Sequence, residues 1–381
     1  MRRGTAAAAK LGTAVCAVAL LLAWPQARHG AQLLAAQDDP ARLSDLQLDS
    51  TLARQPDLIA GNITAALESH DADLARSLVE LADARHVAVD PALRQRVTSM
   101  VTDENSGRQM ATRFATGLVT GRSDDIAGLS GTVAGDLFVF GDVRDMLREG
   151  KHLVAGEDTD RLILGLAAAG IAVTAATYVT VGGAAPVRAG LTLVKDARKV
   201  GRLSEGLAKW AGRSAREVVD APALQRAVGE ASLLRPGATV DAIKASIRTE
   251  KAGSLMRLAK DVGRVGEKAG TRGAFDALKV AEGPKDVARA ARLAESKAGQ
   301  TRGILKILGR GALLLTTGFW NIAWWIFSAA ITLFGLIASL KSGVERMTQA
   351  HLDRRKAKRA KRLLAQARAT REAPQPLAVA A

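Results

Sequence analysis

The side chains in this sequence most suited to binding or catalysis are the carboxylates between residues 135 and 160. Asp142, Asp145 and Glu149 stand at positions i, i+3 and i+7, so a helix would carry all three on one face. The candidate interaction cluster comprises Asp136, Asp142, Asp145, Glu149, Glu157, Asp158 and Asp160. Such a cluster could bind a cation or a basic partner.

A plainer interpretation of these carboxylates also stays open. In that interpretation they are solvated charges on a helix next to a membrane, and they complement the N-terminus of the helix that follows. Arg144, Arg148 and Lys151 are expected on another face of the same helix. This interpretation is favoured over a binding site, and catalysis by paired carboxylates would need a pocket that no pattern supports.

The other candidate residues do not match a complete catalytic or metal-binding motif. The stretch 128–132 (GLSGT) approaches the nucleophile elbow of hydrolases but lacks its last glycine and a preceding strand. The five histidines never fall at metal-ligand spacing. The single cysteine, Cys16, excludes an intramolecular disulfide and cysteine-based metal sites. We therefore expect no enzymatic activity, no metal and no cofactor.

Three long runs without a charged residue organise the chain. Hydrophobic residues make up 48% of the 381 residues and aromatic residues only 3%, so the apolar content is concentrated in these runs. The first run, 11–24, follows Arg2, Arg3 and Lys10 and is typical of a signal peptide or signal anchor within residues 1–27. Cleavage and retention both stay open, because Pro25 stands where a small residue is usual.

The second run covers residues 162–187. Glycines and a proline near its end are expected to stop the helix near Val181, which leaves enough residues for a hydrocarbon core of about 30 Å. Ala168, Ala172 and Ala176 recur every four residues, a pattern that lets another helix approach closely. The run is predicted to be a transmembrane helix.

The third run, 311–340, is too long for one upright crossing. Trp320, Trp324 and Trp325 cluster in it and are predicted to be membrane-interface anchors. A tilted single crossing and a bent re-entrant segment are both open. The re-entrant form is favoured, because a single crossing would place the basic tail 341–381 on the opposite side from the basic residues before the run.

Charge is distributed unevenly along the chain. Residues 25–160 carry a net charge of −9, residues 188–310 carry +13, and residues 341–381 carry +8. This distribution favours an acidic exported domain at 28–160, a basic cytoplasmic region at 188–310 and a basic tail, in a bacterial inner membrane.

The predicted fold class is all-α. Asp71 is a good N-cap for a helix whose face carries Leu74, Leu78 and Leu81. Asp90 followed by proline predicts the start of another helix. Residues 28–160 are therefore expected to form a small helical bundle.

Residues 188–310 are expected to be loosely packed helices broken by glycine, without a cleft. Lys-Ala-Gly recurs at 251–253, 268–270 and 297–299, where each glycine is predicted to end a helix. We expect this region to bind anionic lipid headgroups. Nucleic acid is disfavoured as a partner, because the region has only Trp210 and Phe275 as stacking aromatics.

The stretch from Gly135 to Arg202 carries the pattern GD…GDxRDxxREG…GExxD and runs into a small-residue membrane helix. It resembles uncharacterised membrane proteins of Gram-negative bacteria, particularly alphaproteobacteria. That resemblance implies a membrane protein and brings no established activity. A fainter likeness is to the helical segments that precede toxin domains in secreted polymorphic toxins.

The function expected from these patterns is that of a non-enzymatic integral inner-membrane protein in envelope organisation or partner docking. Its expected partners are the lipid bilayer, an unknown protein and, through its helices, further copies of the chain. The alternative is a pore-forming or toxin-like protein that inserts residues 311–340. A membrane enzyme built on the acidic cluster is a third class.

Overall fold

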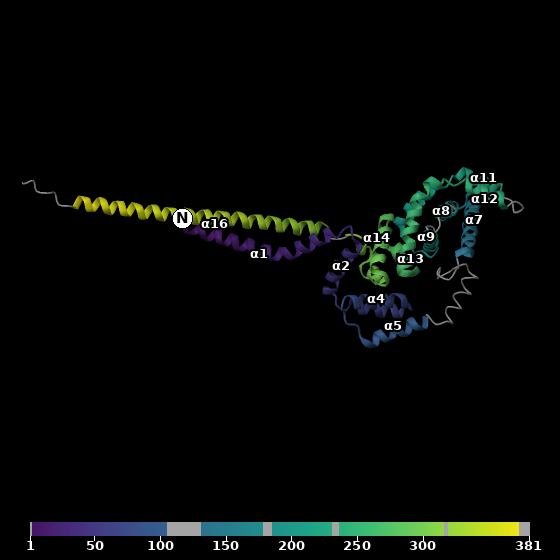
Figure 1. Cartoon of the computed structure of the whole chain (residues 1–381), viewed down its shortest axis with the longest axis horizontal. Helices are drawn as coiled ribbons and strands as arrows, with labels where there is room; N and C mark the ends of the chain where they lie inside the picture. The colour runs from purple at the N-terminus through teal and green to yellow at the C-terminus, as the bar shows by residue number, and fades with distance from the viewer. Residues whose placement is uncertain (1, 105–130, 178–184, 231–235, 316–318, 373–381) are drawn as a thin grey trace, which may run out of the picture. The chain divides into compact units, whose positions relative to one another are not determined.

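The computed structural model describes residues 2–104, 131–177, 185–230, 236–315 and 319–372 (Figure 1). Within these ranges the chain is helical and has no β-strand, only an isolated bridge between Val219 and Ile247. The all-α prediction is therefore confirmed. The chain forms two compact units, a central unit (Ala35–Thr317) and a terminal unit that combines Met1–Leu34 with Gly318–Ala381.

The central unit begins with four helices, α2 (Pro40–Arg54), α3 (Leu58–Glu68), α4 (Ala72–Ala84) and α5 (Pro91–Glu104). An aspartate side chain caps the start of three of them, α2, α4 and α5. The Asp71 carboxylate accepts a hydrogen bond from the Leu74 amide at 3.1 Å, and Leu74, Leu78 and Leu81 are buried. Both predicted helix starts in this region are confirmed.

The remaining helices of the central unit share one continuous apolar core with the first four. They are α7 (Gly131–Ala155), α8 (Arg161–Thr177), α9 (Ala185–Lys199), α10 (Glu205–Val218), α11 (Ala221–Gly229), α12 (Pro236–Ala245), α13 (Gly253–Val280), α14 (Pro284–Lys297) and α15 (Thr301–Leu308).

Glycine lets two of these helices approach backbone to backbone. A Cβ at Gly190 of α9 would collide with the Ala259 carbonyl of α13, and a Cβ at Gly263 of α13 would collide with the Pro186 carbonyl. The expectation of loosely packed helices at 188–310 is therefore wrong. Gly190 and Gly263 serve close packing, whereas the glycines of this region were expected only to break its helices.

Helix α8 occupies the run that was predicted to cross a membrane. All its side chains from Leu162 to Ala172 are buried, and it packs between α7 and α10. Its small residues do admit neighbours, since a Cβ at Gly165 would collide with Ala215 of α10. A helix that is apolar on all sides is explained by burial in protein as well as by lipid. The prediction of a transmembrane helix at 162–187 is therefore not confirmed, since residues 162–172 are buried in the central unit. Residues 178–184 lie outside the described ranges.

The acidic and basic halves of the central unit are in direct contact. Arg302 pairs with Asp71 at 2.8 Å, and Lys297 pairs with Asp45 at 2.7 Å. Residues that form ion pairs cannot lie on opposite sides of a membrane. The expected division into an exported segment 28–160 and a cytoplasmic segment 188–310 is incompatible with this packing.

The terminal unit contains two long helices, α1 (Arg2–Ala35) and α16 (Phe319–Glu372). They lie side by side and antiparallel (Figure 1). Ala23 and Ala27 of α1 form a buried cluster with Ala329 of α16. Farther along the pair, a Cβ at Gly335 would lie 3.4 Å from the sulfur of Cys16.

The third uncharged run is divided between the two units. Ala312 and Leu313 are buried in the core of the central unit, whereas α16 begins at Phe319 and continues unbroken to Glu372. A re-entrant turn near Trp324 is not confirmed, because that residue lies inside a continuous helix. The apparent excess length of the run comes from residues that belong to the central core.

Candidate functional site

The predicted carboxylate cluster lies in the central unit, where α7 faces α8 and α9. Asp142 and Asp145 both reach Lys195 of α9. The Lys195 ammonium donates hydrogen bonds to both carboxylates, at 3.1 Å in the case of Asp145. Asp145 and Lys195 are buried residues, so this is an internal ion cluster.

Tight packing around Asp142 has an electrostatic consequence. A Cβ at Gly170 of α8 would collide with the Asp142 carboxylate, so only glycine leaves room for it. Burial raises the pKa of Asp142 to about 6, although the positive charges of Lys195 and Arg188 oppose the increase. The neighbouring Asp145 carboxylate adds to it.

The outer carboxylates of the cluster bind the turn between α7 and α8. The buried Glu149 side chain accepts a hydrogen bond from the Asp160 amide at 2.9 Å. Asp160 accepts a hydrogen bond from the Leu162 amide at 3.1 Å, which caps α8, and pairs with Arg198 at 2.9 Å.

The other three members are not drawn into this network. Glu157 lies 3.6 Å from the His152 ring, and Asp158 is exposed. Asp136 belongs to α7, but its side chain lies outside the described part.

The predicted cluster is therefore partly assembled, and its basic partner comes from the same chain. The two predicted faces of α7 are present, because Arg144, Arg148 and Lys151 are exposed while Asp145 and Glu149 are buried. The expectation of solvated acids is wrong at these two positions. Among the described residues, no group of three or more His, Cys, Asp or Glu side chains could hold a metal.

A second buried network links the two ends of the central unit and was not predicted. Arg302 of α15 donates hydrogen bonds to both oxygens of Asp71 at 2.8 Å and one to Asp276 at 2.8 Å. Arg272 pairs with Asp71 at 3.2 Å. Partial burial alone would raise the pKa of Asp71, but the Arg302 guanidinium and the Leu74 amide lower it to about 2.

Sequence spacing could not find this network, because Asp71 and Arg302 are 231 positions apart.

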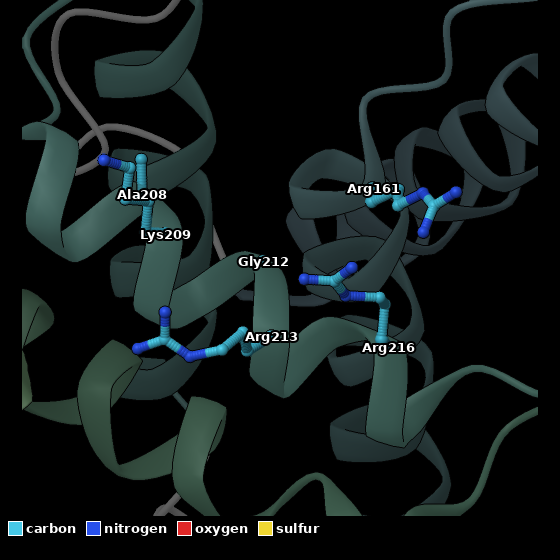
Figure 2. A pocket seen from close by; sticks show the side chains of 6 residues that line it. All are labelled: Arg161, Ala208, Lys209, Gly212, Arg213 and Arg216. Carbon is cyan, nitrogen blue, oxygen red and sulfur yellow. The ribbon is translucent and has the colours of Figure 1, made fainter.

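A basic groove lies between α10 and the start of α8 (Figure 2). Its volume is about 310 Å³. The lining residues are Arg161, Ala208, Lys209, Gly212, Arg213 and Arg216. Lys209, Arg213 and Arg216 stand at positions i, i+4 and i+7, so the sequence alone indicates that they share one face of a helix.

Comparison with known proteins does not assign this chain to a family. No family model, curated protein or solved structure matches this chain.

The terminal unit presents large apolar side chains to its surroundings. Leu21 of α1 is 74% exposed, and Phe334 and Trp324 of α16 are 74% and 62% exposed. Among the described residues, one helix is long and apolar enough to cross a membrane, the segment Ala323–Ala365 of α16. Of the predicted anchors, Trp324 and Trp325 are exposed on this helix.

The side chain of Trp320, the third predicted anchor, lies outside the described part.

Proposed function

We propose that this protein is a membrane-anchored, non-enzymatic docking protein held in the bilayer by a hairpin of α1 and α16. The observation that carries this proposal is the exposure of large apolar side chains on two helices that pair through small ones. Alanines at i and i+4, such as Ala23 and Ala27, allow close helix contact in lipid, where apolar burial gives no driving force. The pairing also favours retention of α1 as an anchor over its removal as a signal peptide.

The register of the pair agrees with the thickness of a bilayer. Residues 319–340 of α16 form about 33 Å of helix, close to the hydrocarbon core of about 30 Å. Trp24 adjoins Ala23, whose contact is Ala329, so Trp24 and Trp325 occupy the same end of the hairpin. Tryptophan is enriched at membrane interfaces, and this end would form such a belt.

The other end of the hairpin is basic. Arg2, Arg3 and Lys10 flank the apolar run of α1, and Lys341 and Arg346 flank that of α16. Because basic flanks stay in the cytoplasm, we place this end there. The chain enters and leaves the central unit from the opposite end, so the central unit would lie on the exported face of an inner membrane.

The distribution of charge between the two units supports an exported central unit. It does so more simply than a central unit divided between the two sides of the membrane. The central unit has a net charge of +4 and the terminal unit +12. The strongly basic and acidic segments of the central unit neutralise one another by ion pairing. The remaining excess belongs to the terminal unit, mostly at its basic end.

Cysteine labelling in spheroplasts tests the proposal. In a Cys16→Ser background, single cysteines replace Ser99 and Ala221 of the central unit and Ala357 of α16, all exposed. Positions 99 and 221 should react with a membrane-impermeant maleimide in intact spheroplasts, whereas position 357 should react only after lysis. Labelling of 99 and 221 on opposite sides, or extraction of the full-length protein by carbonate, would contradict the proposal.

A further inference from the structure

We propose that the basic groove formed by α10 and the first residue of α8 binds the phosphate group of an anionic ligand. This inference does not depend on the membrane topology proposed above. Four of the six residues that line the groove are cationic, and the other two are Ala208 and Gly212. Figure 2 shows that these side chains come from two helices and that the guanidinium groups of Arg161 and Arg213 extend to opposite sides of Arg216.

The charges of this groove are largely uncompensated. Lys209 pairs with Glu205 in the preceding turn. Arg161, Arg213 and Arg216 have no ion-pair partner within the described ranges. The nearest acidic residue in sequence to Arg161, Asp160, already pairs with Arg198 and caps α8. Three guanidinium groups thus remain available to an anion.

Arginine is suited to phosphate because its planar group offers several N–H donors in a fixed geometry. A tetrahedral phosphate can accept hydrogen bonds from more than one such group. A carboxylate has only two oxygens and offers fewer acceptors to neighbouring arginines. The groove therefore fits a phosphate better than an acidic side chain.

Small residues keep the groove open. Gly212 lies in the middle of α10, where alanine would be the better helix former. A Cβ at this position would meet no atom within 4 Å, so the packing of the central unit does not require glycine. Its absence of a side chain instead leaves space between Lys209, Arg213 and Arg216.

Phosphate chemistry could come from a soluble phosphate compound or from a lipid headgroup. A ligand from either source would contact the groove through its phosphate group. They differ in whether acyl chains add affinity, and the experiment separates them on that basis.

Calorimetric titration of the purified full-length protein in an uncharged detergent tests the site. Pyrophosphate is the first probe, and binding should be saturable and weaken as salt is added. The combined Arg161→Gln, Arg213→Gln and Arg216→Gln variant should bind about tenfold more weakly or worse. Gly212→Leu keeps every charge, adds bulk in open space, and should also lose about tenfold or more if the ligand occupies the groove.

A matched control removes the same charge elsewhere on the central unit. Arg257, Lys260 and Arg292 are exposed, and their combined change to glutamine should leave pyrophosphate affinity within about twofold. Equal loss in the control, unsaturable binding, or unchanged affinity in the groove variants would overturn the proposal. Helicity and thermal unfolding of each variant establish that it is folded.

Two further ligands identify the source of the phosphate. Dibutyryl phosphatidic acid and glycerol 3-phosphate carry the same headgroup with and without acyl chains. Tighter binding of the former by about tenfold would support a lipid headgroup, and equal or weaker binding would support a soluble phosphate compound. Failure of both to compete with pyrophosphate would count against a common phosphate site.

Discussion

Asp142 and Asp71 are both aspartates with cationic partners, yet their pKa values move in opposite directions. Asp142 shares one lysine with Asp145 in a buried position, so the cost of burial exceeds the attraction and its pKa rises to about 6. Asp71 is less buried and is paired with two arginines, so its pKa falls to about 2. The depth of burial decides the direction, because it is the largest effect on the pKa of Asp142 and is outweighed by the arginines at Asp71.

Asp71→Asn should cost about 2 kcal/mol or more in the free energy of unfolding at pH 7. Asparagine still caps α4, so the change removes mainly the charge that Arg302 needs. Because the folded pKa is lower than the ordinary value, this stabilisation is present above about pH 4 and is lost as the pH falls through about 2. Urea unfolding of the full-length protein in detergent from pH 7 to pH 2 measures it.

The exposed pair between Asp83 and Arg94 provides the control. Asp83→Asn should change stability by less than about 1 kcal/mol, because water screens an exposed ion pair. An equal loss at both positions would show that burial of Arg302 contributes nothing.

Asp142→Asn should flatten the pH dependence of stability between about pH 4 and pH 6. The folded protein holds the Asp142 proton more tightly than the unfolded chain, so wild-type stability falls as the pH rises through this window. The fall is on the order of 3 kcal/mol at most. Urea unfolding at half-unit pH steps compares the two proteins, with the exposed Asp158→Asn as control. Parallel curves for wild type and Asp142→Asn would refute the assignment.

At the scale of elements, the same residue type has different roles on different helices. Gly190 and Gly263 are required where α9 and α13 touch, whereas Gly212 faces open space on α10. Gly270 interrupts α13 with a positive φ of 76°, in the role that the Lys-Ala-Gly pattern predicted. At the last repeat of that pattern Ala298 takes the positive φ, and Gly299 leaves room for Glu80.

Gly190→Ala should destabilise the protein by about 1 to 3 kcal/mol, because the new methyl group would displace the α13 backbone. Gly212→Ala should have the opposite sign and stabilise by up to about 1 kcal/mol through helix propensity. Thermal unfolding of the two variants side by side measures both. Similar effects at both positions would mean that the close approach of α9 and α13 is not needed.

Local rules predicted the parts of the fold that depend on neighbouring residues. Helix starts at Asp71 and Asp90 and the two faces of α7 follow from side chains a few positions apart, and the structure has them. The burial of α8 in protein could not be predicted in this way, because the same apolar sequence is compatible with lipid and with a protein core. Only the position of α7 and α10 against it distinguishes the two environments.

The basic groove could likewise be predicted only in part from the sequence. The spacing of its α10 cations was visible in the sequence, but Arg161 joins them only because α8 packs against α10. Likewise, the pairing of Asp142 with Lys195 spans 53 positions and depends on how α7, α8 and α9 are folded together.

At the scale of the whole molecule, the proposed hairpin predicts a definite depth for its tryptophans. Lipids brominated near the headgroup should quench Trp324 and Trp325 more strongly than lipids brominated near the bilayer centre. A variant that keeps these two tryptophans and replaces the other three by phenylalanine isolates their fluorescence. Stronger quenching at the centre would place the pair in the middle of the bilayer and contradict the proposed register.

The pairing of α1 with α16 also orders events during synthesis. The two helices are separated by about 280 residues, all of which the ribosome makes after α1 and before α16. At about 5 to 20 residues per second, α1 waits roughly 15 to 60 s for its partner. Throughout that interval the small-residue face of α1 lacks its partner, and the central unit can complete its core before α16 exists.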